Sequence, residues 1–115
     1  MATEHRITLA NAEGKVTVKW RGHIIAETSE ALELREASYP PVLYVPRGDA
    51  KLAYFDRTSR ETTCPYKGIA NYFSLTSDGA RDENAVWTYE SPKAGVAAIA
   101  GHLAFYPDKV EIIRE

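Results

Sequence analysis

Alternating polar and apolar residues mark the first clear element of the chain. Residues 15–20 place two valines and a tryptophan on one face, which is the two-residue period of a half-buried β-strand. The alternation stops at Gly22 and resumes over residues 23–26. We therefore predict a β-hairpin over residues 15–26, with the glycine at the turn position that needs a positive φ.

Further strands are expected where apolar or β-branched residues cluster between turn residues. They are predicted at residues 6–10, 31–36, 42–45, 69–75, 86–89, 102–106 and 110–113. Leu32 and Leu34 share one face of the second of these strands and are predicted to point inward. Residues 77–79 and the Pro107 region are predicted turns.

Helical signals are short. Asp49 is a candidate cap for one helical turn over residues 50–55. Ser91, Pro92 and Gly101 frame a run of small residues, an order typical of a short capped helix. Short strands with at most two helical turns exclude a parallel α/β sheet, which needs longer crossovers. The predicted fold class is all-β, an antiparallel open barrel or sandwich.

Composition changes this picture little. The 115 residues are 44% apolar and 26% charged, with a net charge of −2 and no long run of like charges. Residues 1–115 are therefore expected to form a single globular domain. No basic patch indicates nucleic acid, and no apolar run or signal peptide indicates a membrane, so a cytoplasmic location is expected. The oligomeric state is left open.

The cysteine and histidine content argues against metal chemistry. Cys64 is the only cysteine, so a disulfide within the chain and a cysteine cluster for zinc are both excluded. His5, His23 and His102 are far apart and do not have metal-ligand spacing. We expect no metal and no cofactor, and a single cysteine fits a reducing compartment.

Four short motifs together carry a family resemblance. They are YVPRGD at residues 44–49, TCPYKG at 63–68, WTYESP at 87–92 and GHLAFY at 101–106. In this combination and order, the chain resembles the bacterial "domain of unknown function 427" family, from about Trp20 to about Ile112.

The resemblance implies a compact all-β domain related to the β-tent folds, which include methionine sulfoxide reductase B and the ligand-binding domain of cereblon. Many β-tent relatives bind zinc through two cysteine pairs, and here Cys64 stands alone. The family also carries a nucleotidyltransferase-like label. This sequence has neither the glycine-rich phosphate cradle nor the spaced aspartates that would hold magnesium and a triphosphate.

The leading functional hypothesis is a small-molecule binding domain, with an anionic metabolite among the candidate ligands. Tyr66, Trp87 and Tyr89 would line an aromatic cleft, because tyrosine and tryptophan combine a large ring with a polar tip. Arg47, Asp49 and Lys67 would supply its polar groups. Each of these six residues also has a purely structural interpretation, the rings as core and the charged side chains as solvated loop residues.

The rival hypothesis is a cysteine-dependent enzyme. Cys64 would attack an electrophilic substrate, Lys67 would lower the pKa of the thiol, and His102 would transfer the proton. The structural alternatives are a packed thiol and a hydrogen-bonded histidine at a strand edge. A third hypothesis, a structural or protein-interaction module, has no distinguishing feature in the sequence.

Overall fold

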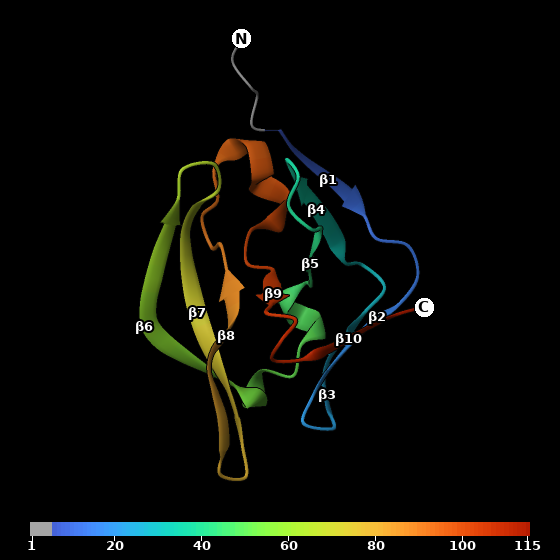
Figure 1. Cartoon of the computed structure of the whole chain (residues 1–115), viewed down its shortest axis with the longest axis vertical. Coiled ribbons are helices and arrows are strands. Elements are labelled where there is room, and N and C mark those ends of the chain that lie inside the picture. The colour runs from blue at the N-terminus through green and yellow to red at the C-terminus, as the bar shows by residue number, and fades with distance from the viewer. Residues whose placement is uncertain (1–5) are drawn as a thin grey trace.

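Antiparallel sheets make up most of the structure (Figure 1). The computed structural model describes residues 6–115, and ten strands there form three sheets. The first sheet has the order β1 (Ile7–Asn11), β4 (Leu32–Glu36), β5 (Val42–Tyr44). The second has the order β10 (Glu111–Arg114), β2 (Val16–Trp20), β3 (His23–Thr28). The third has the order β6 (Phe55–Cys64), β7 (Gly68–Ser77), β8 (Ala80–Thr88), β9 (Leu103–Phe105). The all-β antiparallel prediction is confirmed, and because the sheets do not close into a barrel, the fold is sandwich-like.

The β2–β3 hairpin forms where the alternation predicts it. Val16, Val18 and Trp20 are almost fully buried, as expected for the inward face of a strand. Arg21 and Gly22 have φ angles of +50° and +85°, so both turn residues adopt the left-handed conformation that matches the twist of a hairpin.

Strand β6 was missed by the sequence patterns. Its ten residues are mostly charged or hydroxyl-bearing, and most are exposed because β6 is an outer strand of its sheet. An edge strand needs few apolar residues, so its periodicity is weak. The pairing with β7 is also irregular between Arg57 and Glu61, which interrupts the alternation further.

Three short 3₁₀ turns are the helical elements of the described residues: η1 (Arg47–Asp49), η2 (Leu52–Tyr54) and η3 (Ala94–Ile99). No helix within residues 6–115 is long and apolar enough to span a membrane.

Both predicted helix caps are wrong. η2 follows Lys51 without a side-chain cap, because the Asp49 carboxylate instead accepts a hydrogen bond from Thr28 Oγ1 at 2.7 Å. η3 follows Lys93, not Ser91, and also has no side-chain cap. The Lys93 N–H donates to the Lys67 carbonyl at 3.0 Å, which holds the residues before η3 in an extended path.

Two clusters of buried side chains form the core. One joins the second sheet to the third and includes Trp20 and Phe73. The other joins the first sheet and η3 to the third, and includes Leu34 and Tyr72. Because neighbouring residues of a strand point to opposite faces, Tyr72 and Phe73 of β7 supply different clusters. The candidate site lies on the Tyr72 face.

Candidate functional site: an aromatic cleft

A cleft of about 890 Å³ opens between the first and third sheets. One wall comes from β4, β5 and the segment 39–41 between them, and the other from the β6–β7 turn and strands β7 to β9. We call it the aromatic cleft because eight rings line it: Tyr39, Tyr44, Tyr66, Tyr72, Trp87, Tyr89, Phe105 and Tyr106. Its size suits a small organic molecule.

Strand register brings the central rings together. Tyr72 of β7 and Trp87 of β8 are direct partners in the sheet, so their side chains project from the same face. The Trp87 ring contacts Tyr106 at a centroid distance of 4.6 Å and meets Tyr44 edge-on at 6.4 Å. Trp87 Nε1 also donates a hydrogen bond to the Tyr44 hydroxyl at 3.2 Å, which fixes the indole relative to the opposite wall.

The phenol groups of the cleft are embedded in apolar surroundings. Burial raises the pKa of Tyr44 and of Tyr89 well above the usual range for a phenol. Burial, together with the hydrogen bond to Tyr72, raises the pKa of Tyr106 to about 12. These three hydroxyl groups therefore stay protonated at neutral pH and remain available as hydrogen-bond donors.

Tyr72 differs from the other phenols. Burial alone would raise its pKa, but hydrogen bonds from Thr62, Tyr106 and Arg60 lower it overall. Its hydroxyl lies 2.9 Å from Thr62 Oγ1, and the Arg60 guanidinium lies 5.0 Å from the centre of its ring. This end of the cleft thus favours negative charge more than the rest does.

An ion pair joins the two walls. Lys67 Nζ in the β6–β7 turn lies 2.6 Å from Glu36 Oε1 at the end of β4, and Lys67 is only 8% exposed. Burial alone would lower the pKa of Lys67, but the hydrogen bond to Glu36 and the proximity of Cys64 raise it overall. Because the ammonium already has a counter-charge, this pair adds polarity to the cleft without adding net charge.

Cys64 is the last residue of β6 and also lines the cleft. Its thiol is free and half-buried. Tyr66, two residues further on, is 47% exposed and stands at the rim. Five of the residues singled out from the sequence therefore surround one cavity: Cys64, Tyr66, Lys67, Trp87 and Tyr89.

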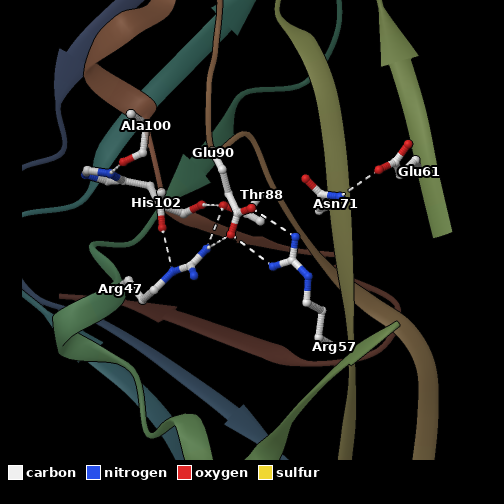
Figure 2. A network of polar contacts seen from close by, with 9 residues as sticks. Arg47, Arg57, Glu61, Asn71, Thr88, Glu90, Ala100 and His102 are labelled. Atoms are coloured by element: carbon white, nitrogen blue, oxygen red, sulfur yellow. Dashed lines mark hydrogen bonds and ion pairs between the residues drawn. The ribbon is translucent and has the colours of Figure 1, made fainter. Parts of the chain in front are cut away.

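Arg47, Asp49 and His102 do not line this cleft. Arg47 donates to the Gly101 carbonyl at 3.1 Å and to Thr88 Oγ1 and the Glu90 carboxylate at 3.2 Å each (Figure 2). His102 has its Nδ1 3.2 Å from the Ala100 carbonyl oxygen.

The Arg47 network lies around Glu90. Figure 2 shows the Glu90 carboxylate between two guanidinium groups, those of Arg47 and Arg57. Arg57 binds it through two hydrogen bonds of 2.9 and 3.0 Å, and both arginines lie within 5.7 Å of the centre of the Phe73 ring. The network links η1, β6 and the segment after β8, and its polar groups bind one another.

Glu36 is the cleft residue that the sequence analysis missed. A signal was present, because the alternation that places Leu32 and Leu34 inward also places Glu36 on the same face. An acidic residue at an inward position indicates a buried partner, here Lys67.

The described residues contain no cluster of three or more histidine, cysteine, aspartate or glutamate side chains suited to a metal ion. His5 lies outside residues 6–115. The expectation of a metal-free protein stays a prediction.

Comparison with known proteins gives one family and no individual relative. No curated protein matches the chain. A family model matches residues 8–115, which covers nearly the whole chain and all four motifs noted in the sequence. The chain belongs to the family described as "Domain of unknown function (DUF427)".

Proposed function

We propose that this domain binds a small, planar, uncharged organic molecule in the aromatic cleft. The observation that carries the proposal is the convergence of Tyr44, Trp87, Tyr89 and Tyr106 on one cavity of about 890 Å³. Cavities of this size with apolar walls and a few polar groups are the usual form of small-molecule sites. Flat rings also favour a flat ligand, because offset stacking and edge contacts add to the burial of apolar area.

The charges around the cleft favour an uncharged ligand over an anion. Lys67 is the buried cation of the cleft, and the carboxylate of Glu36 neutralises it at 2.6 Å. An anion would have to compete with that carboxylate. A neutral molecule can accept a hydrogen bond from Lys67 or from a phenol without separating the ion pair.

Cysteine catalysis has less support from the geometry. Cys64 and Lys67 share the cleft, but the Lys67 ammonium is engaged by Glu36 and His102 lies outside the lining. An interaction module would suit a flat surface better than a cleft. The half-buried free thiol of Cys64 is compatible with the cytoplasmic location that we propose for the protein.

The test is a binding screen with indole, nicotinamide and the free nucleobases, read by thermal denaturation and then by calorimetry. At 100 times its Kd, a ligand specific for the folded state stabilises that state by about 2.7 kcal/mol, which gives a clear rise in Tm. We expect at least one compound to bind, and Trp87→Leu to remove that binding while the variant still folds.

Tyr54→Phe is the matched control, because Tyr54 contacts Trp20 and His23 and does not line the cleft. It should bind the same compound with unchanged affinity. If no compound of the panel binds at millimolar concentration, or if Trp87→Leu binds as well as the unmodified protein, the proposal is wrong.

A further inference from the structure

Strands β5 and β9 come together at one residue pair and then separate (Figure 1). Val45, directly after β5, and Leu103 of β9 exchange two main-chain hydrogen bonds of 2.8 Å. They form an isolated antiparallel bridge, and no second bridge joins β5 to β9 in the described part of the chain. The two strands are therefore edges of different sheets that touch at one end only.

The alternation of antiparallel pairing shows where the main-chain groups of β5 point. Val45 directs its N–H and C=O toward β9, so Tyr44 directs its own toward β4, where its partner is Leu32. Leu43 again faces the β9 side. Its N–H and C=O therefore lie on the free edge of β5.

Strand β9 shows the same alternation. The Tyr106 N–H donates to the Ala85 carbonyl at 3.0 Å, so Tyr106 faces β8 and Phe105 faces away from it. The register set by Val45 and Leu103 would place Phe105 opposite Leu43, but the ladder has already ended. Both residues line the aromatic cleft, so the divergence of the two strands opens into it.

We propose that the aromatic cleft recognises a secondary amide, whose N–H and C=O bind the main chain of Leu43 at the free edge of β5, with Phe105 on the facing edge. The inference rests on the proposed function and specifies the chemistry of its ligand. An amide in an extended conformation matches the donor and acceptor of one strand residue, as in the addition of a strand to a sheet edge.

The edge limits the ligand to a short one. β5 has three residues, and Pro40 and Pro41 precede it, neither of which has an N–H to offer. Leu43 is therefore the one residue of β5 that presents both a donor and an acceptor on this side. A blocked amino acid or a very short peptide satisfies that edge, and an aromatic side chain on it would reach the wall formed by Tyr44 and Trp87.

The test uses ¹⁵N-labelled protein titrated with N-acetyl-phenylalanine N-methylamide. The matched control ligand is N-acetyl-phenylalanine methyl ester, in which an ester oxygen replaces the C-terminal amide N–H. A blocked tetrapeptide with a central phenylalanine distinguishes a peptide ligand from a single amide. We expect shifts at the amides of Leu43 and Phe105, and affinity about fivefold weaker for the ester, because one hydrogen bond is lost.

Two protein variants separate this edge contact from general binding. Leu43→Pro removes the main-chain donor and should weaken the amide ligand, whereas Leu43→Val keeps the donor and should not. Equal affinities for amide and ester, or shifts at Trp87 without shifts at Leu43 and Phe105, would overturn the amide inference and leave the proposed function standing. If the amide fails to bind while a planar compound of the screening panel binds, the inference is likewise wrong.

Discussion

The ion pair between Lys67 and Glu36 is the strongest polar contact between the two walls of the cleft. Its ammonium and carboxylate are largely buried, so removal of one partner leaves the other charge without compensation. We expect Glu36→Gln to lower the free energy of unfolding by about 2 kcal/mol, less than for a fully buried pair. Urea denaturation at pH 7 measures this loss.

Glu33→Gln is a suitable control for that measurement. Glu33 lies on the same strand, but its partners Arg35 and Arg114 are exposed, so we expect a loss of less than about 1 kcal/mol. The pH dependence gives a second check. Because the pKa of Lys67 is raised in the folded protein, its contribution is complete below the unfolded pKa of about 10.4 and is lost as the pH rises through the folded value. Equal losses in the two variants would contradict this account of the ion pair.

Cys64 distinguishes binding from catalysis. In a binding domain the thiol fills space at the cleft wall, so Cys64→Ala should cost about 1 kcal/mol of stability and leave ligand affinity unchanged. Alkylation of the folded protein at neutral pH should be slow, and a bound ligand should slow it further. Rapid stoichiometric labelling, with a rate that titrates below pH 7 and changes in Lys67→Met, would instead support a nucleophile.

Residue types alone located part of the site. Tyr66, Lys67, Trp87 and Tyr89 lie in motifs with a chemical rationale, and all four line the cleft. Arg47 shows the limit of this reasoning. Its sequence neighbourhood is equally suggestive, but the fold turns its guanidinium toward Glu90, a contact across 43 positions that local sequence does not encode.

At the scale of elements, prediction succeeded where one face of a strand is buried. The β2–β3 hairpin has strict alternation and two turn residues with positive φ, so pattern and structure agree. Strand β6 and the start of η3 depend on tertiary contacts instead: β6 is an exposed edge, and the path into η3 is set by the hydrogen bond from Lys93 to Lys67. Local propensity does not contain that information.

The Glu90 network holds several elements together, and its effect should depend on pH. Hydrogen bonds from Arg57, partly opposed by burial, lower the pKa of Glu90, and Arg47 lowers it further. The stabilisation is therefore complete above the unfolded pKa of about 4.3 and is lost as the pH falls through the folded value. We expect Glu90→Gln to reduce the loss of stability between pH 5 and pH 3, measured by urea denaturation. An unchanged acid slope would contradict this role.

At the scale of the whole molecule, the three sheets separate support from recognition. One buried cluster fixes the second sheet against the third, and the other stands behind the aromatic cleft. The two tryptophans fall on opposite sides of this division. Trp20 is fully buried in the first cluster, where its Nε1 donates to Asp82 at 2.7 Å, whereas Trp87 lines the cleft.

This division allows a direct test of the central claim that the aromatic cleft is the binding site. The two indole N–H groups give two separate signals in a ¹⁵N–¹H spectrum, recorded while the screened compound is added. The account predicts that the Trp87 signal moves in proportion to occupancy and that the Trp20 signal stays in place. A compound that binds without moving the Trp87 signal, or that moves both signals equally, would contradict it.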